Sequence, residues 1–231
     1  MLRDELLSQL RDPTVQKALS QTLLWHWSHG GMDVKYCVLP GGKTPERMSK
    51  GAVGFDLFAR AIVDTHQMDE TDGRLRKTLF DFKNYPKDEQ HRAHVHTEVT
   101  VDDNDRPTGR KLSWRLRPND HVLVGVGVAF ALPYEMFQWT APRSGLAAKR
   151  RIQLGNAPGT IDSDYRGEAG LIVVNDGSDD FIIDHHMRIG QLLFQPVIIP
   201  NLIKVEGMDD LGTTERGAGG FGSTGYGGIS S

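Results

Sequence analysis

The sequence predicts a mainly β fold, a distorted jelly-roll sandwich or barrel with helices at its N-terminus. From about Val34 onward, short runs rich in β-branched residues are separated by Gly, Pro, Asn and Asp, which is typical of strands joined by turns. No helical pattern alternates with these runs, which argues against a βαβ sheet. The runs are VKYCVLP, HVLVGVGVAFAL, GLIVVND, FIID, QLLFQPVIIP and LIKVEGM.

Composition limits the classes of protein to consider. The chain has 231 residues, of which 38% are hydrophobic and 25% charged, as in a soluble globular protein. No apolar run approaches the roughly 20 residues that span a bilayer, and the start lacks the features of a signal peptide. A net charge of -3 indicates no nucleic-acid partner. The single cysteine, Cys37, excludes an internal disulfide, so we expect a cytoplasmic protein without membrane or nucleic-acid partners.

Residues 1–32 predict a helical N-terminal extension. Asp12-Pro13 is typical of a helix N-cap followed by proline at the first helical position, and Gly30-Gly31 would end the helical part. We expect these helices to cover the core or an oligomer surface. The apolar residues at helical spacing are Leu2, Leu6, Leu7, Leu10, Val15, Leu19 and Leu23.

A strongly polar stretch, 65–116, interrupts the β-rich pattern. TEVTVDD alternates like a strand, DNDRPTG is typical of a turn, and KLSWRL resembles a returning strand. We therefore interpret 65–116 as an inserted hairpin. His91, His94 and His96 suggest a metal site, but no carboxylate or cysteine pattern fixes a geometry, so a solvated polar face is the favoured interpretation.

The glycine-rich end of the chain, ERGAGGFGSTGYGG, combines groups that suit a nucleotide. Glycine amides and Arg216 can bind phosphates, Ser223 and Thr224 add hydroxyl donors, and Phe221 offers a flat face to a base. Taken alone, 216–231 is more typical of a flexible Gly-rich arm.

Two upstream motifs contain further candidate groups. APRSGLA places an arginine and a serine beside a glycine, which suits a phosphate. In GNAPGTIDSDYRGE, Pro158-Gly159 suit a type II turn at the tip of a β-hairpin, whose backbone could match the hydrogen-bonding edge of uracil and reject cytosine. Asp162 or Asp164 could deprotonate a water.

Five stretches, in order, resemble the motifs of the trimeric all-β dUTPase family. They are AVGFDLFA at 52–59, APRSGLA at 141–147, GNAPGTIDSDYRGE at 155–168, RIGQLLFQ at 188–195 and ERGAGGFGSTG at 215–225. The resemblance covers roughly 34–64 and 117–226. It implies a β core at 33–215 of the dUTPase type that contains the 65–116 insertion.

The resemblance also implies roles for individual residues. Asp162 matches the catalytic aspartate that orients the attacking water, and Tyr165 matches the tyrosine that packs on the deoxyribose. Asp56 matches an aspartate that approaches the metal through water. The matched substrate-binding residues are Asn156, Gly159, Thr160 and Ile161 for uracil, Arg143, Ser144, Gly145 and Gln191 for the phosphates, and Arg216, Phe221, Gly222, Ser223 and Thr224 in the arm.

The family resemblance further implies dUTP as substrate, Mg²⁺ held mostly by the triphosphate, and a homotrimer whose active sites each draw on three subunits. The sequence departs from the family pattern at Phe55, which replaces a tyrosine, and at His186-Met187, which replaces Gly-Asp before the fourth motif.

Three alternatives stay open. A dCTP deaminase, or a bifunctional relative that makes dUMP from dCTP, would need a glutamate on the strand after the third motif, where the alignment puts Ile172. A regulator of this fold could act through a protein partner that contacts the insertion. A purely structural β protein would leave five motifs unexplained.

Overall fold

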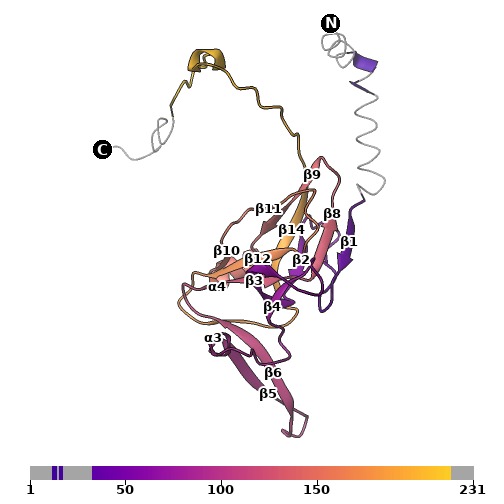
Figure 1. Cartoon of the computed structure of the whole chain (residues 1–231), viewed down its shortest axis with the longest axis vertical. Coiled ribbons are helices and arrows are strands. Elements are labelled where there is room, and N and C mark those ends of the chain that lie inside the picture. The colour runs from indigo at the N-terminus through magenta and orange to yellow at the C-terminus, as the bar shows by residue number, and fades with distance from the viewer. Residues whose placement is uncertain (1–11, 15, 18–32, 220–231) are drawn as a thin grey trace, which may run out of the picture. The chain divides into compact units, whose positions relative to one another are not determined.

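The computed structural model describes residues 12–14, 16–17 and 33–219, and strands dominate them (Figure 1). This confirms the predicted mainly β fold. The chain divides into two units, 1–197 and 198–231. Most of the predicted N-terminal helical extension lies outside the described residues. At its described turn, the Thr14 amide donates to Asp12 Oδ1 at 2.6 Å, as expected of an N-cap. No described helix is both long enough and apolar enough to cross a membrane.

Two larger sheets build the body of the first unit, and every pairing within them is antiparallel. The five-stranded sheet has the order β10 (Ile152–Leu154), β12 (Gly170–Asn175), β7 (His121–Gly125), β3 (Ala61–Met68), β4 (Arg76–Phe80). The four-stranded sheet has the order β11 (Gly159–Ile161), β9 (Met136–Ala141), β14 (Arg188–Pro196), β2 (Phe55–Phe58).

Two smaller antiparallel sheets and three short helices complete the elements of 33–219. The first small sheet is β1 (Lys35–Val38) with β8 (Val128–Ala131), and the second is β13 (Phe181–Ile183), β6 (Pro107–Leu116) and β5 (Val95–Val101). The helices are α3 (Glu89–Arg92), α4 (Ser144–Arg150) and the 3₁₀ turn η1 (Met208–Leu211).

The hydrophobic core lies between the two larger sheets. Buried and half-buried residues alternate along β12, so Leu171 and Val173 point inward and are fully buried. Gly190 on β14 approaches Leu171 so closely that an added Cβ would come within 2.6 Å of Leu171 Cδ1. The two sheets therefore pack face to face, and each large buried side chain contributes about 1.5–3 kcal/mol.

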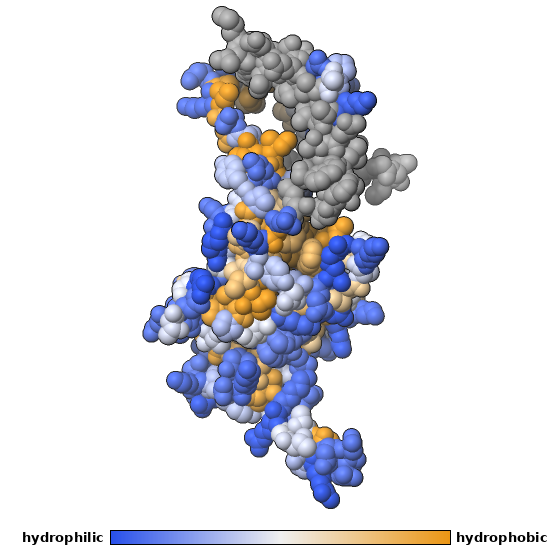
Figure 2. All heavy atoms as spheres, turned by 90° about the vertical axis from the view of Figure 1, so that its right-hand side faces the viewer, coloured by the Kyte–Doolittle hydropathy of each residue, from blue (hydrophilic) through white to orange (hydrophobic). Residues whose placement is uncertain are grey.

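Within the polar stretch 65–116, residues 95–116 form the predicted hairpin. β5 and β6 pair antiparallel and extend away from the other strands (Figure 1). The surface at the lower end of Figure 2, where this hairpin ends, is mainly hydrophilic, although Val99 and Val101 are exposed by 60% and 51%.

The base of the stretch belongs to the core, which its polar composition conceals. β4 joins the five-stranded sheet and β6 pairs with β13. Five of its side chains are buried in the core: Phe80, Phe82, Leu112, Trp114 and Leu116.

His91, His94 and His96 contact different polar partners, but the rings of His91 and His94 both lie beside Trp114. His94 stacks on Trp114 with ring centroids 4.9 Å apart, His91 Nδ1 lies 2.6 Å from Asp88 Oδ1, and His96 Nε2 lies 3.8 Å from Glu98. All three are partly buried, so the predicted solvated polar face is packed in part against neighbouring side chains. Within the described ranges, no group of three or more His, Cys, Asp or Glu could hold a metal ion.

One predicted strand is absent. The run LIKVEGM lies in the second unit, where 201–205 form no strand. Leu202 and Ile203 are exposed by 93% and 83%. A β-rich run needs a partner strand, and the described residues of this unit provide none.

Candidate active site

The third motif crosses from one sheet to the other. β10 pairs with β12, whereas β11 pairs with β9, so the predicted hairpin between them is wrong. The predicted type II turn is also wrong, because it needs Gly159 at positive φ. Instead, Gly159 begins β11 after a cis Ala157–Pro158 peptide bond. An added Cβ on Gly159 would lie 2.4 Å from Thr140 Oγ1 and 2.8 Å from Asn156 Nδ2, so the site has no room for a side chain.

A cavity of about 350 Å³ lies beside this crossing. Residues 156–165 line one side, and strands of the five-stranded sheet line the rest. The lining includes five predicted site residues, Asn156, Thr160, Ile161, Asp162 and Tyr165, together with Thr65, Arg76, Leu123, Glu168, Ala169, Gly170 and Ile172.

Asp162 and Tyr165 differ in how they are held. The Asp162 side chain is exposed, and its carboxylate accepts no hydrogen bond from any described residue. The Tyr165 hydroxyl donates to the Glu168 carbonyl at 2.9 Å. A Cβ on Gly167 would come within 2.5 Å of that hydroxyl, so glycine there lets the ring lie against the backbone. The cavity therefore has one free carboxylate beside a fixed aromatic ring.

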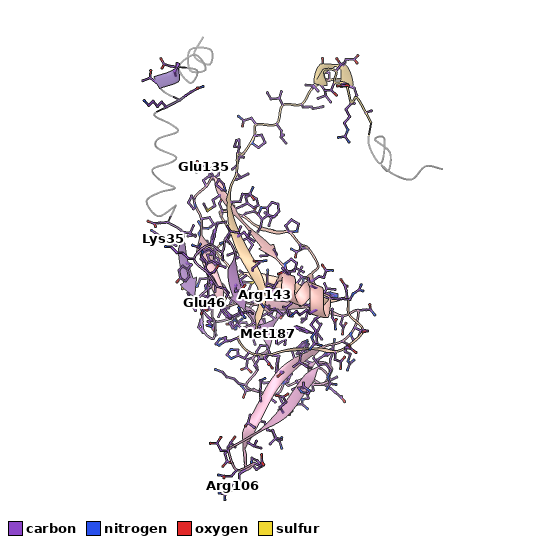
Figure 3. The ribbon with its side chains drawn as sticks, turned by 180° about the vertical axis from the view of Figure 1, so that it is seen from behind. Lys35, Glu46, Arg106, Glu135, Arg143 and Met187 are labelled. Atoms are coloured by element: carbon purple, nitrogen blue, oxygen red, sulfur yellow. The ribbon has the colours of Figure 1, made fainter. Side chains whose placement is uncertain are left out.

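A second group gathers around Asp56. Its carboxylate is buried, with Arg143 Nε at 3.3 Å from Oδ1 and Arg188 Nη1 at 3.2 Å from Oδ2. Arg143 Nη1 also donates to the Arg188 carbonyl at 3.3 Å, beside the Met187 that Figure 3 labels next to Arg143. One buried carboxylate thus aligns two guanidinium groups from different motifs.

The other phosphate-loop candidates adjoin this group. Arg143 is the N-cap of α4, and Ser144 and Gly145 form its exposed first turn. Gln191 pairs in register with Asp56, and its Nε2 donates to the Pro142 carbonyl at 3.0 Å. None of these residues lines the 350 Å³ cavity.

The arm is only partly described. Arg216 belongs to the second unit, where its Nε donates to the Gly219 carbonyl at 2.8 Å. Phe221, Gly222, Ser223 and Thr224 lie outside the described residues.

A buried ion pair beneath the cavity was missed by sequence reasoning. Arg60 Nε and Nη2 bind the two carboxylate oxygens of Glu168 at 2.8 and 2.9 Å, and both residues are buried. The Gly127 and Arg76 amides donate to the same carboxylate at 2.8 and 3.3 Å. The two residues are 108 positions apart, so no local pattern could have paired them. Thr65 and Arg76 were missed because they lie in the polar stretch.

Comparisons with known proteins found a family and relatives that this chain resembles. A family model described as dUTPase matches residues 112–225. A deoxyuridine 5'-triphosphate nucleotidohydrolase of Clostridium acetobutylicum is 43% identical over 110 residues, 48% of this chain and 74% of the relative. The protein of that name from Nautilia profundicola is 46% identical over 110 residues, 48% of this chain and 75% of the relative.

Solved structures share the fold. The dUTPase of Staphylococcus bacteriophage 80alpha, solved with dUPNHPP, aligns with a TM-score of 0.56 at 20% identity over 84% of this chain and 99% of its own. The motif order, the mainly β fold and a relative 43% identical along 74% of its length lead to one conclusion: the chain belongs to the dUTPase family.

Proposed function

We propose that the protein hydrolyses dUTP to dUMP and pyrophosphate, with Asp162 as the general base. The observation that carries the proposal is the cavity, which gathers the expected uracil wall, sugar-packing tyrosine and catalytic carboxylate in one chain. The relatives named as nucleotidohydrolases of deoxyuridine triphosphate support the same substrate.

The chemical step follows from the free carboxylate. A water held by Asp162 attacks the α-phosphorus in line, and its proton passes to the carboxylate. A new P–O bond forms from the water oxygen, the bond from the α-phosphorus to the bridging oxygen breaks, and pyrophosphate leaves. Proton transfer to a positioned base accelerates such steps by about 10²–10⁴-fold. Most of the remaining catalysis of phosphoryl transfer comes from positioning and charge.

The Asp56 group supplies that positioning for the phosphates. Because Asp56 binds both Arg143 and Arg188, their remaining N–H groups are held in fixed directions. Guanidinium donors fixed before the reaction stabilise the charge that develops on the leaving oxygens. Ser144, Gly145 and Gln191 complete the phosphate loop, and the arm from Arg216 onward closes over the nucleotide.

The residues fit a magnesium ion held mostly by the substrate. Asp56 already pairs with two arginines, and the described ranges hold no cluster of three metal-ligating side chains. Mg²⁺ keeps several waters and often binds one or two carboxylates plus phosphate oxygens, so Asp56 would reach it through water. When bound, the ion neutralises charge on the triphosphate.

The Asp162 cavity and the cluster around Asp56 do not form one site within a single chain, which supports a homotrimer with shared sites. The cavity that holds Asp162 is lined by neither Asp56 nor Arg143. A site that needs both groups is completed when the phosphate group comes from a second subunit. An arm contributed by a third subunit would cover it.

The cavity disfavours the deaminase alternative. Ile172 lines it at the position where a deaminase needs a glutamate. Glu168 also lines it, but both of its carboxylate oxygens are bound to Arg60. Ile172 has no group that could transfer a proton, and the Glu168 carboxylate is not free to transfer one at the pyrimidine C4.

The test is pyrophosphate release from dUTP, dCTP and dTTP, each with and without Mg²⁺. We expect release from dUTP alone, lowered about 10²–10⁴-fold in Asp162→Asn. Asp164→Asn, a matched change two residues away, should keep most of the activity. A deoxyuridine product from dCTP, or undiminished turnover by Asp162→Asn, would contradict the proposal.

A further inference from the structure

Arg60 lies in the interior below the segment that carries Asp162 and Tyr165. It stands between β2 and β3, outside the 112–225 range that the family model matches. All three nitrogens of its guanidinium have partners, because Nε and Nη2 bind Glu168 at 2.8 and 2.9 Å and Nη1 donates to Thr78 Oγ1 at 3.3 Å. Arg60 is 8% and Glu168 0% exposed. The pair is therefore closed to a nucleotide and can affect the site only through the residues that it holds.

Glu168 connects the ion pair to the end of the third motif. Besides Arg60, its carboxylate accepts the Gly127 amide at 2.8 Å and the Arg76 amide at 3.3 Å. An added Cβ on Gly125 would come within 2.5 Å of Glu168 Oε1, so the carboxylate has no space to shift on that side. Three segments of the chain thus fix the side chain of the motif's last residue, and Arg60 is the only one of the three contacts that carries a charge.

From Glu168, hydrogen bonds lead back to the residues of the proposed site. The Tyr165 hydroxyl donates to the Glu168 carbonyl at 2.9 Å, and the Tyr165 amide donates to the Asp162 carbonyl at 3.3 Å. An added Cβ on Gly167 would lie within 2.5 Å of the Tyr165 hydroxyl, so the ring lies closely against this turn. The hydrogen bond that orients the Tyr165 ring therefore ends on the residue that Arg60 fixes.

We infer that Arg60 is a positioning residue, which fixes Glu168 and thereby keeps the Tyr165 ring in the orientation that packs on the sugar. Without Arg60, the buried carboxylate has no opposite charge beside it, which is strongly unfavourable. The Glu168 side chain would then turn toward water, and the carbonyl that accepts the Tyr165 hydroxyl would move with it. The inference deepens the proposed function and rests on it, because the sugar contact of Tyr165 belongs to that proposal.

The experiment measures equilibrium binding of dUMP and UMP by calorimetry, which needs no catalytic step. The two nucleotides differ only in the 2′-hydroxyl, for which a ring packed on the deoxyribose leaves no room. In Arg60→Met, we expect dUMP affinity to fall about 3- to 10-fold, the worth of one hydrogen bond, while UMP affinity does not fall. Tyr165→Phe removes the same hydrogen bond without changing the ion pair, so it should cause a similar loss.

The combined variant Arg60→Met/Tyr165→Phe separates positioning from a general loss of structure. If Arg60 acts through the Tyr165 hydroxyl, the two losses in dUMP affinity should not add, and the double variant should bind about as well as either single variant. Two independent effects would multiply instead. The cycle therefore measures the connection between two side chains that do not touch a common ligand atom in the same way.

Further variants guard against the instability that removal of Arg60 causes. Melting curves confirm folding, and binding is measured well below the transition. Arg60→Met/Glu168→Met leaves no unpaired charge, so it should recover stability without recovering the preference for dUMP over UMP. Arg60→Lys keeps a charged contact and should restore part of that preference. Arg115→Met, which removes one partner of an exposed ion pair with Asp180, should keep it in full.

Each remaining outcome decides the matter. If the wild type hydrolyses dUTP but Arg60→Met/Glu168→Met keeps the full preference for dUMP, the pair is only structural, and the inference is overturned while the proposed function stands. Multiplying losses in Arg60→Met/Tyr165→Phe, or a wild type that binds UMP as well as dUMP, would also overturn it. If the wild type neither binds dUMP nor releases pyrophosphate, the proposed function fails and the inference fails with it.

Discussion

Removal of Arg60 should strongly destabilise the protein. In Arg60→Met, the Glu168 carboxylate stays fully buried but loses two charge-assisted hydrogen bonds, of 2.8 and 2.9 Å. Among the described residues, only the Gly127 and Arg76 amides then donate hydrogen bonds to it. Breaking a buried ion pair from one side costs about 3–5 kcal/mol. For a domain of this size, each kcal/mol lowers the melting temperature by about 2–4 °C, so we expect a fall of about 6–20 °C.

The assay is urea unfolding followed by circular dichroism, at one fixed protein concentration because assembly contributes to stability. The double variant Arg60→Met/Glu168→Met, which leaves no unpaired charge, should recover much of the loss. Arg115→Met is the control, because Arg115 and Asp180 form an exposed pair at 3.4 Å with side chains 37% and 46% accessible. It should change the free energy of unfolding by less than about 1 kcal/mol. The reasoning is refuted if Arg60→Met costs no more than this control, or if the two single losses simply add.

Two further predictions concern the turn after β10 and the hairpin base. Gly159→Ala should weaken dUMP binding and lower the melting temperature, because the new Cβ would overlap Thr140 Oγ1 and Asn156 Nδ2; unchanged binding would show that the wall has room to shift. Burial opposes ionisation of Asp184, but bonds from Lys111 and Ser113 outweigh it, so its pKa lies below the ordinary 3.8. A lowered folded pKa gives stability that is present above about pH 4 and lost as pH falls through the folded pKa. Melting temperatures between about pH 5 and 2.5 should therefore fall less steeply in Asp184→Asn than in the wild type, and parallel curves would contradict this.

The sequence predicted the mainly β fold and the hairpin within 65–116 because both depend on local patterns. Alternation in TEVTVDD and a turn-rich DNDRPTG are visible without tertiary information. The base of that stretch was not predictable in the same way. Its few aromatic residues, such as Phe80 and Trp114, stand among many charged residues in the sequence, so the local pattern does not indicate that they are buried.

The candidate site was predicted residue by residue only where motifs exist. The cavity contains Asn156, Asp162 and Tyr165, but the turn before Gly159 was wrong because the flanking strands pair in different sheets. Strand partners are set by tertiary packing, which a turn propensity cannot report. Arg76 lies outside every sequence motif, so only the folded chain shows that it lines the cavity.

The Arg60–Glu168 pair has a consequence for how this sequence can change over time. Replacing either residue alone leaves a charge stranded in the interior, so the intermediate is less stable than both the starting and the doubly replaced chain. The neighbouring Gly125 is restricted in the same way, since a side chain there would come within 2.5 Å of Glu168 Oε1. The two positions should therefore change together during evolution. A sequence that has lost only one of the two residues is expected to have a lower free energy of unfolding until the other is replaced as well.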